Sequence, residues 1–209
     1  MAERVDAARL QPIPREEWSP EVMAAIAVQS SQAPKRPGPP SAGSRKGSNV
    51  LGTFAHHPKL TAAYFAFSGY ILYGSSMTPR NRELAILRVA ALRRAEYEWA
   101  QHVHLAREAG LGDEEIERVL EGPGADGWSP LDATLLTAVD ELVADAGISD
   151  ATWSALAATY DVQQLMDLVF TIGAYELLAM AFNSFGLQLD EDLEATRPRL
   201  GVRSEGGSS

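Results

Sequence analysis

The chain has 209 residues, 45% of them hydrophobic and none of them cysteine, and its formal net charge is −10. Nucleic acid is a poor partner for so acidic a chain, because phosphate contacts need clustered Lys and Arg. Without cysteine there is no disulfide, thiolate metal site or thiol nucleophile. No signal-peptide pattern and no long uncharged apolar run are present, so we expect a cytoplasmic protein with no membrane contact.

The beginning of the chain predicts one short helix followed by a long loop. Ser19 can cap a helix, and Pro20 suits its first position. Residues 30–49 are rich in Pro, Ser and Gly and show no period, which is typical of a loop or tether. We therefore assign residues 1–29 to an arm with a short helix. The loop at 30–49 is either an arm or lid, or a plain connector.

Residues 50–190 read as one helical domain, and the polar residues 191–209 as a tail. The beginnings of the helices are marked by Ser-Pro, Thr-Pro or Asp. Several of their ends are marked by glycine. No run of alternating β-branched residues indicates a strand. The predicted fold class is all-α with about seven or eight helices, and those after the loop cover 58–73, 78–95, 96–110, 112–122, 129–147, 149–160 and 161–186.

The predicted helix 96–110 places two side chains suited to acid–base chemistry on one face. Glu98 and His102 are four residues apart, so they lie one turn above each other. A Glu–His contact at this spacing would orient the imidazole and raise its basicity. His104 lies about 200° round the helix from His102 and is expected to be a surface or packing residue. His102 follows an apolar stripe, and is either a hydrogen-bonded core residue or part of a functional cluster.

Residues 78–122, TPRNRELAILRVAALRRAEYEWAQHVHLAREAGLGDEEIERVLEG, resemble the carboxymuconolactone decarboxylase-like family, which includes alkylhydroperoxidase D. The strings Arg-x-Arg-Glu-Leu-x-Ile-Leu and Tyr-Glu-Trp-x-x-His carry the resemblance, and flanking similarity extends it to most of the chain. The resemblance implies a multi-helix alkylhydroperoxidase D-like fold. It also implies an obligate homo-oligomer, a dimer, trimer or hexamer, with the active site near a subunit contact.

The chain departs from both branches of this family. Peroxidase members carry a Cys-x-x-Cys pair just before the helical His and a relay Glu twelve residues before the first Cys. The relay Glu corresponds here to Glu83 and the helical His to His102, while the thiol positions hold Ala95 and Glu98. Thiol–disulfide chemistry needs a thiolate and is therefore excluded. Decarboxylase members keep a Glu-x-x-x-His, here Glu98 and His102, but do not carry Glu at position 83.

We therefore expect a cofactor-independent acid–base enzyme: a decarboxylase, lyase or isomerase acting on a small acidic or polyketide-like metabolite. Glu98 and His102 would move a proton, and Glu83 would tune or relay it. No metal site is expected, because no His-x-x-x-His or Glu-x-x-His pair is present. The alternative is an inactive family member that binds a small molecule or serves as a scaffold. We assign substrate binding to four residues. Arg82 or Arg88 could hold a substrate carboxylate through two parallel hydrogen bonds, and Tyr97 or Trp99 could line the pocket.

Two predicted helices, 58–73 and 161–186, carry more apolar surface than one small domain easily buries. Both would compete for a single core, and the exposed remainder would form a large apolar patch. A second subunit is the simplest cover. We therefore expect a homo-oligomer that buries well over about 1,000 Å² per pairing, with one of these two helices in the contact.

Overall fold

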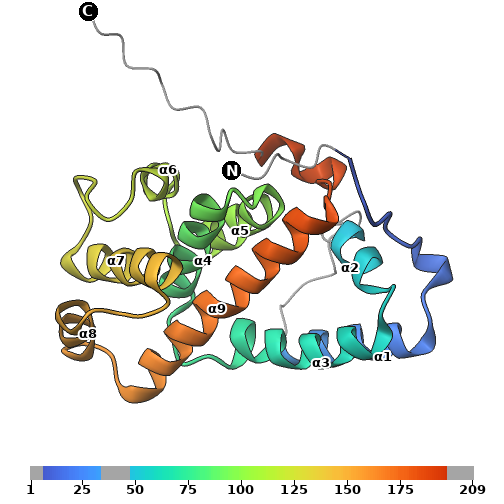
Figure 1. Cartoon of the computed structure of the whole chain (residues 1–209), viewed down its shortest axis with the longest axis horizontal. Coiled ribbons are helices and arrows are strands. Elements are labelled where there is room, and N and C mark those ends of the chain that lie inside the picture. Colours follow the sequence, from blue (N-terminus) through green and yellow to red (C-terminus); the bar gives the residue numbers. More distant parts are fainter. Residues whose placement is uncertain (1–6, 34–47, 197–209) are drawn as a thin grey trace, which may run out of the picture.

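The computed structural model describes residues 7–33 and 48–196, and these residues form an all-α fold without a strand (Figure 1). The predicted fold class is confirmed. Among the described residues one helix more than expected is present, because α2, which begins inside the predicted loop at 30–49, was not predicted. The nine α-helices in this described part of the chain are α1 (Pro20–Gln32), α2 (Ser48–Phe54), α3 (Pro58–Gly69), α4 (Pro79–Arg93), α5 (Glu96–Glu108), α6 (Asp113–Glu121), α7 (Pro130–Asp145), α8 (Asp150–Ala157) and α9 (Val162–Phe185).

Local sequence signals start most of these helices. The side chains of Ser19, Thr78 and Asp161 each accept a hydrogen bond from a backbone N–H in the first turn of α1, α4 and α9. Asp161 and Gln164 form the reciprocal capping box that their spacing predicts. Gly112 is the N-cap residue of α6, and the Glu115 side chain accepts a hydrogen bond from its backbone N–H at 2.9 Å.

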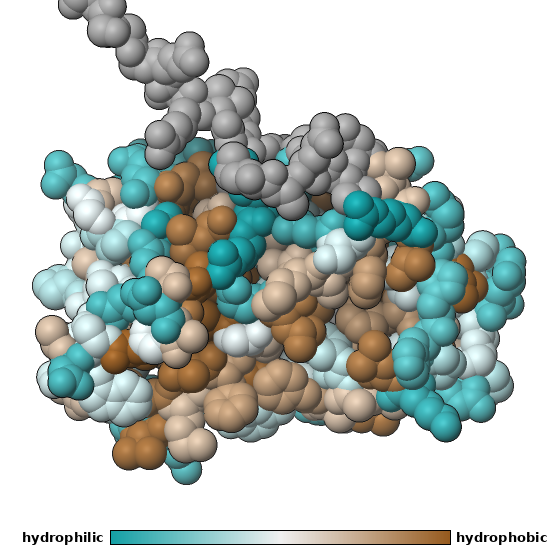
Figure 2. Space-filling view, in the orientation of Figure 1, coloured by the Kyte–Doolittle hydropathy of each residue, from teal (hydrophilic) through white to brown (hydrophobic). Residues whose placement is uncertain are grey.

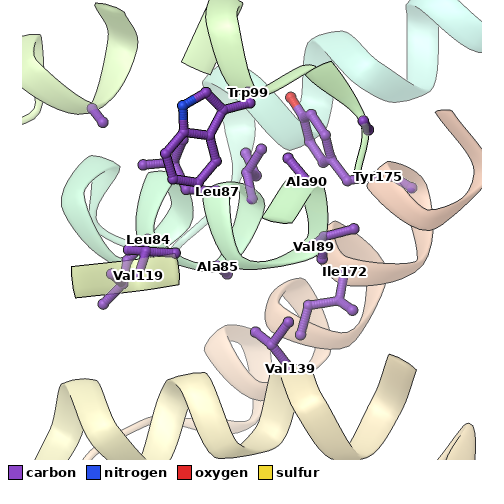
Figure 3. Close-up of a cluster of buried hydrophobic side chains, with 14 of the residues drawn as sticks. Leu84, Ala85, Leu87, Val89, Ala90, Trp99, Val119, Val139, Ile172 and Tyr175 are labelled. Atoms are coloured by element: carbon purple, nitrogen blue, oxygen red, sulfur yellow. The ribbon is translucent and has the colours of Figure 1, made fainter. Parts of the chain in front are cut away.

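The central helix of the fold is α4, which packs against α5, α6, α7 and α9. Side chains around its whole circumference are completely buried, although the helix also carries charged residues (Figure 3). The helix α9 is not central, although its sequence is apolar nearly all round. One face of α9 packs on α4, while the opposite face stays exposed. The fully buried apolar residues of α4 are Leu84, Ala85, Ile86, Leu87, Val89 and Ala90.

By length and composition alone, α9 could cross a membrane. More than half of its most apolar window, 56%, is buried against the rest of the molecule. A core helix of a globular protein has this combination of apolar sequence and burial. The packing therefore assigns α9 to the helical core of the fold.

The two ends of the described chain pack onto the helical body. In Figure 1, α1 runs alongside α3, and Ile13 donates its backbone N–H to Gly52 at 3.0 Å. At the other end, residues 191–196 form a short 3₁₀ helix, η3, with Leu193 fully buried. The predicted tail at 191–209 thus begins too early. Residues 34–47, most of the predicted loop, lie outside the described residues.

Candidate functional site

A tight hairpin of α4 and α5 assembles the centre of the candidate site. Only Arg94 and Ala95 separate the two helices. Arg94 has a left-handed backbone with φ of 52°, and its N–H caps the carbonyl end of α4. Ala95 is then the N-cap of α5. This short reversal brings Glu83, in the second turn of α4, against His102 of α5.

Glu83 and His102 form a buried pair. Nδ1 of His102 lies 2.6 Å from Oε2 of Glu83, and the two side chains are 8% and 1% exposed. The guanidinium of Arg82 lies 3.2 Å from the other carboxylate oxygen, Oε1. A carboxylate at Nδ1 places the proton of a neutral imidazole there. Nε2 then carries the lone pair, and it makes no hydrogen bond to any described residue.

Glu98 makes no hydrogen bond to His102, although the four-residue spacing predicted a contact between them. It is 2% exposed, and neither carboxyl oxygen has a hydrogen-bond partner among the described residues. Burial, and then the negative charge of Glu176, raise the pKa of Glu98 well above 4.5. An unpaired buried carboxylate is costly, so these surroundings favour the neutral acid. Glu98 is therefore favoured in its protonated form, while the hydrogen-bond partner of His102 is Glu83 of α4.

Two tyrosines that the sequence did not single out lie near this region, Tyr175 beside His102 and Tyr64 near Glu98. The ring of Tyr175, from α9, stands edge-on to the His102 ring with centroids 4.8 Å apart. Burial, followed by the charge of Glu83, raises the pKa of the Tyr175 hydroxyl. Burial and the charge of Glu98 likewise raise the pKa of Tyr64, from α3. Both hydroxyls thus remain protonated donors, contributed by helices far from α5 in the sequence.

Arg88, expected to hold a substrate carboxylate, has a structural role instead. It forms a bidentate pair with Asp140 of α7 at 2.7 and 2.8 Å, and its third nitrogen donates to the Val119 carbonyl at 2.8 Å. All three guanidinium nitrogens are therefore occupied. A side chain at Gly122 would approach the same guanidinium at 2.7 Å, so the α6–α7 turn closes directly over Arg88.

Tyr97 and Trp99, expected to line a substrate pocket, are also used in packing. Tyr97 donates its hydroxyl to Asp190 at 2.7 Å and packs its ring on Phe182. Trp99 is 3% exposed and lies in the apolar cluster that includes Leu87 (Figure 3). Of the four predicted binding side chains, only Arg82 contacts the Glu83–His102 pair.

A surface pocket lies away from the Glu83–His102 pair. It measures about 510 Å³ and lies between the segment after α3 and the start of α9, with Phe67, Tyr70 and Phe170 in its wall. None of the three predicted catalytic residues lines it. Among the described residues no group of three or more His, Asp or Glu is arranged to hold a metal ion.

The helices that carry the pair match a known family. Residues 58–141 match the carboxymuconolactone decarboxylase family. This match confirms the resemblance predicted from the sequence, over α3 to most of α7. A search among curated proteins finds no significant relative.

Solved structures share the fold at low identity. A peroxidase-related protein from Ralstonia eutropha with an alkylhydroperoxidase core has a TM-score of 0.71 and 18% identity, over 88% of this chain and 93% of its own. A putative antioxidant defence protein from Agrobacterium tumefaciens has a TM-score of 0.61 and 20% identity, over 66% and 94%. A cysteine-to-alanine variant of the debrominase Bmp8, in complex with 2,3,4-tribromopyrrole, has a TM-score of 0.68 and 15% identity, over 93% and 97%. These likenesses establish an alkylhydroperoxidase D-like fold.

The family resemblance aligns the two thiol positions of the peroxidase members with Ala95 and Glu98. Ala95 is the N-cap of α5 and is 1% exposed, and Glu98 lies one turn further along the helix. The pair that corresponds to the peroxidase relay, Glu83 and His102, is in contact. This carboxymuconolactone decarboxylase-like region thus has a buried, uncompensated carboxyl at one thiol position and a methyl group at the other.

Proposed function

We propose that the chain is a cofactor-independent acid–base enzyme of the decarboxylase, lyase or isomerase type, acting on a small acidic or polyketide-like carbonyl compound. The observation that carries the proposal is the buried 2.6 Å contact between Glu83 and His102. The carboxylate on Nδ1 orients the imidazole and leaves Nε2 as the nitrogen that can accept a proton. The family match supports an enzyme that acts on a small molecule.

The two sides of the site suit opposite halves of one proton transfer. Nε2 of His102 would take a proton from a carbon next to a carbonyl, and the electron pair would move onto the carbonyl oxygen. The neutral carboxyl of Glu98 would donate a proton to that developing oxyanion. His102 then gives its proton to a different carbon while the enol hydroxyl returns its proton to the Glu98 carboxylate, and an isomer results. If the substrate instead loses carbon dioxide, His102 first takes the proton of the substrate's carboxyl group. The electrons of the broken C–C bond move onto the carbonyl oxygen, and protonated His102 gives the proton to the carbon that carried the carboxyl group.

The surroundings indicate what such a substrate would resemble. Tyr64 and Tyr175 offer ring faces and protonated hydroxyls, which suits a small unsaturated or aromatic carbonyl compound. Arg82, 13% exposed, is the cation nearest the pair and could attract an acidic group. The structural neighbour in complex with a bromopyrrole supports the idea that this fold can enclose a small ring.

Solvent isotope exchange can test this proposal before the substrate is known. The protein is incubated with a cell metabolite extract in D₂O, and mass spectrometry searches for metabolites that gain deuterium or disappear. We expect such changes with the wild type and with Glu117→Gln, a control on the exposed face of α6. We expect them to be reduced about 100-fold or more in His102→Gln, because general acid–base catalysis contributes that much.

Two results would overturn the proposal. The first is that His102→Gln changes the metabolites of the extract as fast as the wild type does, which would show that His102 is not catalytic. The second is an extract that the wild type leaves unchanged while retaining one of its metabolites, which would favour a binding protein.

A further inference from the structure

The surface pocket between the end of α3 and the first turns of α9 has a composition suited to a ligand. Its volume of about 510 Å³ falls within the range of small-molecule sites in proteins. Three aromatic rings and one carboxylate line it, from Phe67, Tyr70, Phe170 and Asp167, whereas no Lys, Arg or His does. Figure 2 shows apolar side chains gathered over the side of the molecule where α3 and α9 lie in Figure 1.

The carboxylate of Asp167 accepts hydrogen bonds from neutral groups only. The Tyr70 hydroxyl donates to its Oδ1 at 2.7 Å, and the backbone N–H and hydroxyl of Ser76 donate to its Oδ2 at 2.6 and 2.7 Å. Burial raises the pKa of Asp167, but the hydrogen bonds from Ser76 outweigh it, so the group is ionised at neutral pH. No Lys, Arg or His of the described residues forms an ion pair with it. Its negative charge is therefore uncompensated, although most of its hydrogen-bonding capacity is used.

Aromatic rings stand beside this carboxylate. Phe67 and Phe170 pack edge to face, with ring centroids 6.4 Å apart and planes at 71°. Their side chains are 37 and 54% exposed, so aromatic surface remains available to a ligand. The face of an aromatic ring is negative and attracts cations. A cation in the pocket would thus meet a full negative charge and aromatic faces together.

The position of the Tyr70 ring depends on a glycine. A Cβ at Gly74 would lie 2.8 Å from that ring, so a larger residue would push the ring away. The backbone does not itself require glycine, because the φ of Gly74 is not positive. Tyr70–Gly74 also form a π-helical turn, a rare geometry that is frequent at functional sites. The local chain geometry therefore maintains the Tyr70 ring and its hydrogen bond to Asp167.

We propose that this pocket binds a small quaternary ammonium cation, a choline-like molecule without an acidic group. The site is independent of the reaction proposed at Glu83 and His102. A quaternary ammonium donates no hydrogen bond, so it needs negative charge and aromatic faces rather than free acceptor atoms. A primary ammonium has three donors, which the Asp167 oxygens could not all accept, because they already accept from Tyr70 and Ser76.

The charges of the pocket and of the whole chain favour the same class of ligand. An acidic group on the ligand would find no cationic partner, because no Lys, Arg or His lines the pocket. The formal net charge of −10 also attracts small cations and repels anions. This excludes zwitterions that carry a phosphate or carboxylate next to the ammonium group, including the headgroup of phosphatidylcholine.

Isothermal titration calorimetry on the full chain can compare choline with three molecules that each differ from it in one property. The alcohol 3,3-dimethylbutan-1-ol has the same shape but no charge, ethanolamine carries a primary ammonium, and phosphocholine adds an acidic group. We expect choline to bind about tenfold or more tightly than each of them, because only choline combines a positive charge, no donors on nitrogen and no acidic group.

Substitutions in the pocket test which groups hold the cation. Asp167→Asn is expected to weaken choline about tenfold or more while the affinity for the uncharged alcohol stays the same, a pattern that a mere loss of structure would not give. Phe170→Leu keeps an apolar side chain without the ring and should weaken choline about threefold or more. Gly74→Ala should weaken it by displacing Tyr70. Trp153→Leu on α8, at an aromatic side chain that is 44% exposed, is the matched control and should leave the affinity unchanged. Circular dichroism confirms that each variant is folded.

Several results would overturn the proposal. Choline that gives no binding heat at millimolar concentration, or that binds no more tightly than the uncharged alcohol, would show that the pocket does not select a cation. Tighter binding of ethanolamine would show that it selects hydrogen-bond donors. An affinity for choline that Asp167→Asn and Phe170→Leu both leave unchanged would place the binding elsewhere. Flotation of the protein with phosphatidylcholine vesicles, released by free choline, would identify a lipid headgroup that the pocket is expected to reject.

Discussion

Replacing Glu98 by Gln is expected to stabilise the folded protein, by an amount that grows with pH. In the folded protein, burial and the charge of Glu176 raise the pKa of Glu98 well above 4.5, whereas in the unfolded chain the carboxyl ionises near that ordinary value. Between these two pKa values unfolding releases a proton, so the native state loses stability as the pH rises. Glutamine has nearly the same shape, stays neutral and has no proton to release.

The size of the effect follows from the linkage between protonation and folding. Each pH unit between 4.5 and the folded-state pKa of Glu98 should add about 1.4 kcal/mol to the difference between Glu98→Gln and the wild type. For a chain of this size that corresponds to roughly 3–5 °C in melting temperature per pH unit. Below about pH 4 the carboxyl is largely neutral in both states, and the difference should nearly vanish.

Thermal unfolding followed by circular dichroism at pH 4, 5, 6, 7 and 8 measures this difference directly. Glu117→Gln is the control, because its carboxylate lies in water on α6, and its difference from wild type should stay nearly flat. If the wild type and Glu98→Gln melt in parallel across this range, Glu98 is ionised in the folded protein. The proton-donor role assigned to it would then be refuted.

Three further substitutions test contacts that hold the helices around the site. Arg88→Lys keeps the charge but loses the bidentate pair with Asp140, and should cost about 3 kcal/mol in a urea titration, whereas a cost near zero would contradict the packing role. Tyr97→Phe removes a hydroxyl that donates to a buried carboxylate and should cost about 1–2 kcal/mol in the same assay. Asp167→Asn should cost about 1–3 kcal/mol at pH 7. Burial raises the pKa of Asp167, but hydrogen bonds from Ser76 outweigh it, so the pKa of the folded protein lies below 3.8. The cost of the substitution should therefore fade as the pH falls below 3.8, and a cost independent of pH would contradict this.

The helices were predictable because their signals are local. The Ser19, Thr78 and Asp161 caps lie where the sequence indicates them, and the predicted helix at 161–186 agrees with Val162–Phe185 within one residue at each end. The π-helical turn at Tyr70–Gly74 was not separated from α3, because its apolar pattern continues that of the helix. Which helix would be central was not predictable, because apolar content does not say which faces find a partner.

The partners of the site residues were harder to predict. Glu98 and His102 share a helix face, yet the contact of His102 is with Glu83, nineteen residues earlier, because the α4–α5 turn decides which side chains meet. Spacing within one helix cannot supply that information, and the family resemblance supplied the clue. Tyr175 lies in a helix that looks uniformly apolar, so nothing in its own neighbourhood marked it.

The α4–α5 hairpin has a consequence for how this fold can change its chemistry. Glu83 and His102 are held together by two consecutive helices and a two-residue turn, so the reacting pair is specified by one short stretch of chain. The groups around the pair come from elsewhere, with Tyr64 on α3 and Tyr175 on α9. Substitutions on those outer helices can therefore alter which molecule fits against His102 while the pair itself stays in place. In the proposed enzyme, reactivity and selectivity would be carried by separate segments, and engineering for a new substrate would begin on α3 and α9.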